Sequence, residues 1–560
     1  MCGIYGYIGK CDAYIEVLNG LSRLQYRGYD SCGIAYFDKG FKINKAIGTL
    51  DNLPQTLECT PIIAFGHTRW ATNGEVNIVN THPHTSYDKE FVLVHNGIIK
   101  NSDKLKKELI EKGISFYSDT DTEVIVNLIA SLSGKIEKRL EKLYKILDGS
   151  FSLIIGDKSG DIYIMKKFSP LNILQADDGI YISSDVSSLK NGFLYTLKDF
   201  DIIKITDNDI VPLSRTIIDF IPHENKIVEF SLGKFKHYML KEIYDTPKGI
   251  EKTYYYLQRQ DIRKIFKHYN EFTLIGCGTA YHSCLIGEEY FSKTARLKVH
   301  SYLASNYTIE RKIKRNHLHI IVSQSGETAD CIKVAEQIKK FNGKILLITN
   351  EESSTMARLA DYKIFTKAGK ELAVASTKTY CTQVFVFAYI AQLIVDKRFS
   401  LDIKDFVNQL TKFIGKINIK SLVNKLKDKD KLILIGRDID YALLLEASLK
   451  IREIDYIYTI PMYSGELKHG TLSLIDNDSV ILSLNTSSDI SKLDVVKNEI
   501  ESRGGEVVEI DKLVDLTHIQ KYLKPIFAII PFQLLSYNIA LEKGYNPDMP
   551  RNLAKSVTVE

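Results

Sequence analysis

The cysteines of this 560-residue chain lack the spacings of a metal site or a disulfide framework. No two of the eight form a Cys-x-x-Cys pair, and they are too sparse to staple a small fold. Reduced thiols are typical of cytoplasmic proteins, so we expect a cytoplasmic location. The cysteines lie at positions 2, 11, 32, 59, 277, 284, 331 and 381.

The chain also lacks a strong excess of either charge and a membrane-spanning run. Its 74 basic and 69 acidic residues give a net charge of +5, so we expect a mixed, solvated surface and no nucleic-acid partner. No basic segment followed by an apolar one opens the sequence, which argues against a secretory signal. The longest apolar run, Val384–Val395, is interrupted by Gln392 and predicts a buried core helix and no membrane partner.

The first ~220 residues combine short β-branched and aromatic runs with two helical stretches. Strands are expected at Ile62–Gly66, Phe91–Val94 and Phe151–Gly156, and helices near Leu105–Lys112 and Thr122–Leu132. Strands and helices that do not strictly alternate predict an α+β sandwich.

The pattern changes after a polar, basic stretch at Pro222–Lys236, which is typical of a linker. Apolar strands ending at Gly276 and Gly436 each run through a turn into a helix, and each is followed by a further apolar strand. This rhythm predicts two related α/β halves with parallel sheets, although generic α/β packing can also produce it.

Cys2 is the first candidate catalytic residue. Once Met1 is removed, its thiol and a free α-amine share one residue, and an amine with a pKa near ~7.7–8.0 can act as the base for the thiol. The alternative is an ordinary cysteine that happens to be second in the chain.

Residues at predicted strand and helix ends offer Cys2 an oxyanion hole and substrate contacts. Asn96 and Gly97 follow an apolar strand and suit oxyanion donors, while Arg69 can pair with a carboxylate. The segment Ser118–Glu123 opens a helix, and one of its acidic residues can accept an ammonium. Each has a plainer alternative, namely a turn, a surface ion pair or a helix cap.

Together these segments resemble the N-terminal-nucleophile glutamine amidotransferases. The resemblance implies a four-layer αββα fold that hydrolyses glutamine to glutamate and ammonia. It makes Cys2 the nucleophile, Asn96 and Gly97 the oxyanion hole, and it assigns glutamine binding to Arg69, Asp121, Trp70, Thr72 and His82. Trp70, the single tryptophan, would also gate an ammonia channel. Asn73 departs from the family, which usually has histidine there. The motifs are Met1–Ile4, Tyr26–Ser31, Arg69–Trp70, His82–His84, His95–Ile99 and Thr120–Glu123.

The second half contains a loop suited to an anion. Ser323–Thr328 follows an apolar strand and precedes a helix, so hydroxyls and backbone N–H groups can hold a phosphate. A serine-rich helix cap is the alternative. A second loop of this kind is Ala375–Lys378.

Three charged residues, Glu446, Lys450 and Glu453, lie at i, i+4 and i+7 of a predicted helix and so share one face. A surface ladder of ion pairs is the usual explanation. Because the surrounding positions are apolar, we expect a triad that faces a pocket and moves protons.

His469 lies between flexible positions and can act as an acid or base near neutral pH. The tail from Pro550 is expected to be irregular, as a frayed terminus is.

The second half resembles the sugar-isomerase (SIS) domains of the isomerising glutamine–fructose-6-phosphate aminotransferases, and the resemblance covers nearly the whole chain. It rests on Ser323–Thr328, Gly465–Gly470 and Arg551–Glu560. It implies conversion of fructose 6-phosphate and glutamine to glucosamine 6-phosphate and glutamate, the first step of hexosamine synthesis. Ammonia would pass through an internal channel, no metal or cofactor would be needed, and the SIS half would form a homodimer.

The same resemblance assigns roles to individual residues. Lys555 would form a Schiff base with the sugar, and Glu453 would move a proton between C1 and C2, supported by Glu446 and Lys450. His469 would open the sugar ring in the neighbouring subunit. Ala280 departs from relatives that have serine there. The sugar-phosphate contacts would be Thr279, Ser323, Gln324, Ser325, Thr328, Val374, Ser376 and Ala554.

The implied organisation is a glutaminase domain at 1–222, a linker at 223–238, SIS domains at 239–405 and 406–545, and an active-site tail at 546–560. Two other functions stay open. An amino-sugar deglycase with SIS domains would not need the glutaminase residues, and a non-catalytic sugar-phosphate sensor would not need Glu453 and Lys555.

Overall fold

The computed structural model describes residues 2–71, 74–206, 209–224, 232–308, 313–352, 354–486 and 491–555. These residues fold into two compact units, one before and one after residue 230. Thr72, Asn73 and the last five residues of the predicted tail lie outside the described residues.

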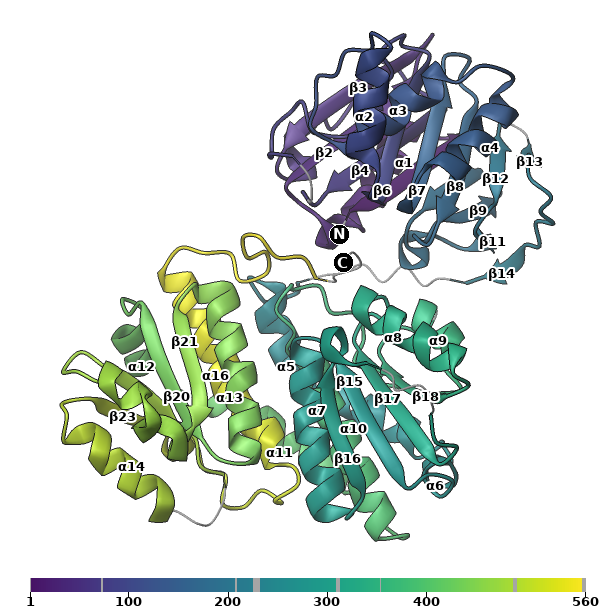
Figure 1. The fold of residues 1–560 in the computed structure, drawn as a ribbon. Helices are drawn as coiled ribbons and strands as arrows, with labels where there is room; N and C mark the ends of the chain where they lie inside the picture. Colours follow the sequence, from purple (N-terminus) through teal and green to yellow (C-terminus); the bar gives the residue numbers. More distant parts are fainter. Residues whose placement is uncertain are drawn as a thin grey trace. The chain divides into compact units, whose positions relative to one another are not determined.

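The first unit contains two antiparallel sheets (Figure 1). One has the order β14 (Ile221–His223), β11 (Gly192–Thr196), β9 (Asn172–Ala176), β10 (Gly179–Ser183), β1 (Gly3–Gly9), β4 (Ile63–Arg69), β2 (Ser31–Phe37), β3 (Phe41–Ile47). The other has the order β13 (Ile210–Pro212), β12 (Ile202–Ile205), β8 (Ile162–Lys167), β7 (Gly149–Asp157), β6 (Phe91–Ile99), β5 (His84–Thr85).

Alternation along the strands creates the layers of this unit. On β1, Ile4 and Ile8 enter a core shared with Val92 and Val94 of the other sheet, whereas Tyr5 and Tyr7 face the opposite way. Helix α1 (Ala13–Ser22) covers that outer face. Helices α2 (Ser102–Glu111), α3 (Asp121–Ser131) and α4 (Ile136–Ile146) cover the outer face of the second sheet. The predicted αββα arrangement is confirmed.

The second unit has two parallel sheets, which confirms the α/β prediction. One has the order β16 (Lys298–Leu303), β15 (Glu271–Gly276), β17 (His317–Ser323), β18 (Lys344–Thr349), β19 (Tyr362–Phe365). The other has the order β21 (Tyr458–Tyr463), β20 (Lys431–Gly436), β22 (Val480–Ser483), β23 (Glu506–Glu509).

A layer of central helices lies between these two sheets (Figure 1) and builds the largest core of the chain. The layer contains α5 (Tyr238–Leu257), α7 (Thr279–Glu289), α10 (Lys378–Val395), α13 (Ile439–Lys450) and α16 (Lys524–Glu542). Further helices are α6 (Ile262–Phe266), α8 (Ala329–Lys340), α9 (Thr355–Leu359), α11 (Ile403–Lys416), α12 (Lys420–Leu426), α14 (Ser491–Glu501) and α15 (Ile510–Leu513).

Helices α10 and α16 are long and apolar enough to cross a bilayer by length and composition, but both are mostly buried inside this unit. The expected core helix at Val384–Val395 is therefore confirmed, and it already begins at Lys378.

The two sheets of the second unit belong to repeats of one pattern. In each, a strand ends in glycine and a residue with positive φ (Gly278, 52°; Asp438, 49°) precedes a helix. Each helix, α7 and α13, continues into a π-helical turn, η4 (Tyr290–Thr294) and η6 (Ile451–Asp455). The repeated order of elements agrees with the predicted duplication. Pro222 and His223, at the start of the stretch expected to be a linker, pair with β11 as part of β14.

Candidate active sites

Strand pairing places Cys2 beside the segment after β4. Gly3 lies opposite Thr68, so Cys2 meets Trp70, whose backbone N–H donates to the Cys2 Sγ at 3.2 Å. The Asn96 Nδ2 donates to the Cys2 carbonyl oxygen at 3.1 Å. The thiol is half-buried, and burial raises its pKa. A nearby base is therefore needed to form the thiolate.

Strand β6 carries the two predicted oxyanion donors. The Asn96 Oδ1 is buried without a hydrogen-bond partner in the part of the chain that the structure describes. Gly97 has φ of +133°, and a Cβ there would come within 2.0 Å of the Ser150 carbonyl oxygen. The backbone at this point therefore accepts only glycine.

Arg69 and Asp121, the predicted glutamine-binding pair, are both buried at element ends. Arg69 closes β4, and its Nη1 and Nη2 donate to the Glu75 and Gly74 carbonyl oxygens at 3.2 and 3.3 Å. Asp121 opens α3 and accepts from the Ile99 backbone N–H at 2.9 Å. Burial raises the pKa of Asp121, but nearby His95 and this N–H outweigh it and hold the pKa below its usual value. Asp121 is therefore ionised at neutral pH, as an ammonium acceptor must be.

The other two described residues of the predicted glutamine set differ in exposure. Trp70 is half-buried and meets the Tyr29 ring edge-on, with centroids 6.1 Å apart. His82 is buried, with its Nε2 3.0 Å from the Thr122 Oγ1 and its ring stacked on His67. Burial lowers the pKa of His82 well below its usual value, so it is neutral and supports the start of α3.

In the second unit, one cavity of about 370 Å³ brings together residues from both repeats and from the tail. Glu446 lies behind its wall, fully buried. The residues singled out from the sequence that line it are Thr279, Ala280, Ser323, Gln324, Ser325, Thr328, Val374, Ser376, Lys450, Glu453, Ala554 and Lys555.

The loop after β17 has the form of an anion site at the start of α8. The Ser323 Oγ accepts from the Gly326 backbone N–H at 3.1 Å and lies 3.0 Å from the Thr328 Oγ1. Gly326 has φ of +65°, and a Cβ there would meet the Ser354 Oγ at 2.1 Å. This tight turn directs hydroxyls and the N-terminus of α8 toward the cavity, which suits a phosphate.

The predicted triad is present and is joined to the other repeat. Lys450 forms ion pairs with Glu453 and, at 3.2 Å, with Glu446. Glu446 accepts from the Thr279 Oγ1 at 3.0 Å and lies 2.7 Å from the His282 Nδ1. Burial raises the pKa of Glu453, more than Lys450 lowers it. A carboxyl shifted in this direction is suited to exchanging protons with a ligand in the cavity.

The Ser376 loop does not leave an open anion site, because a side chain of the protein already occupies it. The Glu371 carboxylate accepts from the Thr377 and Thr379 backbone N–H groups at 3.0 and 3.1 Å, and from the Ser376 Oγ at 2.9 Å. The same carboxylate pairs with Lys555. The loop therefore holds the Lys555 amine at the cavity wall.

Sequence reasoning missed three residues of this site, Glu371, His282 and Glu242. Glu242, on α5, is buried beside Glu371; burial and that charge raise its pKa to about 8. None of the three belongs to a local repeat or spacing, and only tertiary packing brings them behind the residues that line the cavity. A lone acidic residue before a Ser-Thr loop was the one available signal, at Glu371.

The tail is irregular, as predicted, but it is anchored at the start of α5 and at Tyr456. The Asp548 carboxylate accepts from the Tyr238 and Met239 backbone N–H groups at 2.8 and 2.7 Å, which caps α5. The Arg551 guanidinium lies 4.1 Å from the centre of the Tyr456 ring. These contacts hold the segment of the tail that precedes Lys555. His469, in contrast, is exposed on η7 (Ser464–His469) and does not line this cavity.

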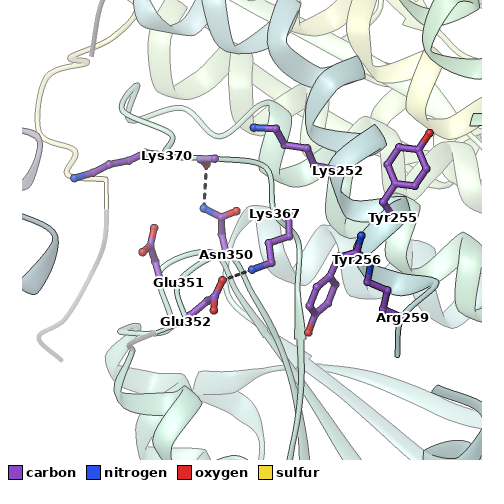
Figure 2. A pocket seen from close by; sticks show the side chains of 10 residues that line it. Lys252, Tyr255, Tyr256, Arg259, Asn350, Glu351, Glu352, Lys367 and Lys370 are labelled. Carbon is purple, nitrogen blue, oxygen red and sulfur yellow. Dashed lines mark hydrogen bonds and ion pairs between the residues drawn. The ribbon is translucent and has the colours of Figure 1, made fainter. Parts of the chain in front are cut away.

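A second cavity of the same unit, about 680 Å³, is basic and aromatic, and contains none of the predicted site residues. Figure 2 shows the Tyr256 side chain on α5 beside Lys367, which pairs with Glu352, whereas the Tyr255 ring points away from Lys367. The Asn350 Nδ2 donates to the Gly369 carbonyl oxygen at 3.0 Å.

Comparisons with known proteins agree with both units. Protein-family models described as a glutamine amidotransferase domain and as a SIS domain match residues 68–191 and residues 265–393 and 425–522. The chain is 36% identical over 619 residues to the "Glutamine--fructose-6-phosphate aminotransferase [isomerizing]" of Clostridium acetobutylicum, with all of both chains covered. Identity to the protein of the same name from Pyrococcus horikoshii is also 36%, with full coverage.

Among solved structures, the C-terminal domain of glucosamine-fructose-6-phosphate aminotransferase from Francisella tularensis matches with a TM-score of 0.51 and 29% identity. The match covers 57% of this chain and 100% of that one. With relatives above 30% identity over their full length, and with both domain types matched, the chain belongs to the family of isomerising glutamine–fructose-6-phosphate aminotransferases.

Proposed function

We propose that the protein converts fructose 6-phosphate and glutamine to glucosamine 6-phosphate and glutamate. The observation that carries this proposal is the shared cavity of the Ser323 loop, Glu453 and Lys555. It combines an anion site, a carboxyl with a raised pKa and a lysine amine, which are the groups needed to bind a sugar phosphate, move its protons and attack its carbonyl.

In the sugar reaction, the phosphate lies at the Ser323 loop and the start of α8. Once it has lost a proton, the Lys555 amine attacks the C2 carbonyl of the open sugar, and water leaves to give a Schiff base. Ammonia then replaces Lys555 at C2, and Glu453 transfers a proton from C1 to C2. Lys450 supports the charge of Glu453, and Glu446 connects Lys450 to Thr279 and His282.

In the glutaminase reaction, the Cys2 thiolate attacks the side-chain amide carbonyl of glutamine. Asn96 and the Gly97 backbone N–H stabilise the oxyanion, and Arg69 and Asp121 hold the α-carboxylate and α-amine. Ammonia leaves, and water hydrolyses the thioester to glutamate. We also propose that the ammonia travels through an internal channel gated by Trp70, and that Thr72 and His82 complete the glutamine site.

We further propose a cytoplasmic homodimer formed through the SIS domains. The exposed position of His469 supports this assembly, because ring opening by His469 then requires the cavity of a second subunit. The domain boundaries proposed for the working enzyme are 1–222, 239–405 and 406–545, with the linker at 223–238 and the tail at 546–560.

The test supplies glutamine labelled at the amide nitrogen together with fructose 6-phosphate. Label in glucosamine 6-phosphate is expected for the wild-type chain and absent for Cys2→Ala and for Lys555→Ala. Glutamate formation separates the two variants, because only Lys555→Ala should retain it. Unlabelled product, or no amino sugar at all, overturns the proposal and favours a deglycase or a sugar-phosphate sensor.

A further inference from the structure

Two cysteine sulfurs lie side by side at the edge of the proposed sugar-phosphate cavity. The Cys277 and Cys331 Sγ atoms are 3.9 Å apart. Cys277 follows β15 directly, and Cys331 lies in the first turn of α8. From the sequence, both are expected to be ordinary reduced thiols, and the proposed reaction uses neither.

The two thiols differ in access and in protonation. Cys277 is half-buried and lines the cavity, whereas Cys331 is fully buried. A hydrogen bond from the Cys331 S–H lowers the pKa of Cys277, and burial opposes this effect less strongly. The same bond, together with burial, raises the pKa of Cys331 well above its usual value. Cys277 is therefore the accessible nucleophile, and Cys331 is a protected thiol beside it.

We propose that Cys277 and Cys331 form a peroxide-sensitive pair whose disulfide reversibly blocks the sugar-phosphate cavity. The Cys277 thiolate attacks one oxygen of hydrogen peroxide, breaks the O–O bond and becomes a sulfenic acid, with hydroxide as the leaving group. The Cys331 sulfur then attacks the Cys277 sulfur, water leaves, and a disulfide forms. In sum, two thiols are oxidised and one peroxide is reduced to two waters.

The disulfide acts on the elements that build the site. Bonding requires the sulfurs to move from 3.9 Å to about 2 Å apart. Cys277 is followed by Gly278 and Thr279, and α8 is preceded by the Ser323 loop. Drawing the end of β15 toward the first turn of α8 therefore narrows the cavity between them. This inhibitory part rests on the proposed function, whereas the disulfide itself does not.

The chemical step can be tested without any activity. The Cys2→Ala variant is used because it lacks the proposed glutaminase thiol. It is treated with hydrogen peroxide, its remaining free thiols are alkylated, and its peptides are identified by mass spectrometry. We expect a cross-linked peptide joining Cys277 and Cys331 that is two hydrogens lighter, and its loss on treatment with dithiothreitol. Sulfinic acid at Cys277 without a cross-link, or no oxidation of either residue, overturns the proposal.

Binding of fructose 6-phosphate, measured by calorimetry on the same chain, tests the consequence. Peroxide should weaken binding at least tenfold, and dithiothreitol should restore it. Cys331→Ala in this background should bind the sugar normally and resist peroxide, whereas the control Cys11→Ala should stay sensitive. A cross-link that leaves binding unchanged overturns the block. If reduced chains bind no sugar while the cross-link still forms, the proposed function fails and the redox pair stands.

Discussion

Lys555 forms an ion pair with Glu371, which precedes it by 184 positions in the chain. Both side chains are almost completely buried, and the Glu371 carboxylate also accepts two backbone N–H groups at the start of α10. One carboxylate therefore stabilises a helix end and positions the amine proposed to form the Schiff base.

Replacing this carboxylate should cost stability at neutral pH. Burial opposes ionisation of Glu371, but Lys555 outweighs it and lowers the pKa to about 2, against ~4.3 in an unfolded chain. Because the folded pKa is depressed, the stabilisation is present above pH ~4.3 and is lost as the pH falls toward 2. We expect Glu371→Gln to lower the free energy of unfolding at pH 7 by about 3 kcal/mol. Urea unfolding followed by circular dichroism measures this; an unchanged midpoint contradicts it.

The contribution of Glu242 to stability should depend on pH in the opposite direction. Its pKa is raised to about 8, so folding is favoured below pH ~4.3 and that contribution is lost as the pH rises through 8. The loss by pH 8 is on the order of 4 kcal/mol. Glu242→Gln keeps the shape and removes the charge, so the variant should be more stable than wild type at pH 8 and nearly equal to it at pH 5. Calorimetric melting at the two pH values decides; a variant less stable at pH 8 argues against a buried, titrating carboxyl.

Replacing Lys450 alone should lower the free energy of unfolding more than replacing Lys450 together with Glu446. Lys450→Met leaves Glu446 and Glu453 buried without their cation, which costs about 3–5 kcal/mol. The double variant Glu446→Gln with Lys450→Met removes one of these uncompensated charges and should regain part of the loss. Urea midpoints of the single and double variants measure the coupling, and purely additive losses contradict it.

The triad Glu446, Lys450 and Glu453 could be predicted from the sequence, whereas the buried Glu371 could not. Glu446, Lys450 and Glu453 were predicted because helical spacing is a local property that the periodicity reveals. The loop at Ser323 followed from its position between an apolar strand and a helix. Glu371 and His282 could not be found in this way, since packing between distant elements brings them to the site. The Ser376 loop was predicted to bind a ligand, because the acidic residue that precedes it in the sequence does not by itself show that the Glu371 carboxylate accepts the hydrogen bonds of that loop.

The cap that the tail supplies to α5 should matter for the sugar reaction. Asp548→Ala removes two acceptors from the Tyr238 and Met239 N–H groups, at a cost of about 1 kcal/mol. Because the same segment leads to Lys555, we expect a higher KM for fructose 6-phosphate with little change in glutamine hydrolysis. Asp515→Ala, at an exposed aspartate of the same unit, serves as the control. Equal KM values for the two variants contradict the role of the cap.

Cys2→Ala should separate the two reactions. Glutamine hydrolysis is expected to fall on the order of 10⁴-fold, because the nucleophile is lost. Isomerisation of fructose 6-phosphate depends on the cavity that Glu453 and Lys555 line, and it should continue. Parallel assays of glutamate and of isomerised sugar measure both, and simultaneous loss of the two argues against separate sites.

The hydrogen bonds from Thr279 and His282 to Glu446 have an evolutionary consequence. They join corresponding helices, α7 and α13, of two repeats with the same order of elements. In the proposed reaction, the first repeat holds the phosphate and the second provides acid and base groups. Neither repeat alone retains a complete set, so a change in either is selected in the context of the other. The two copies have become complementary partners that can no longer substitute for one another.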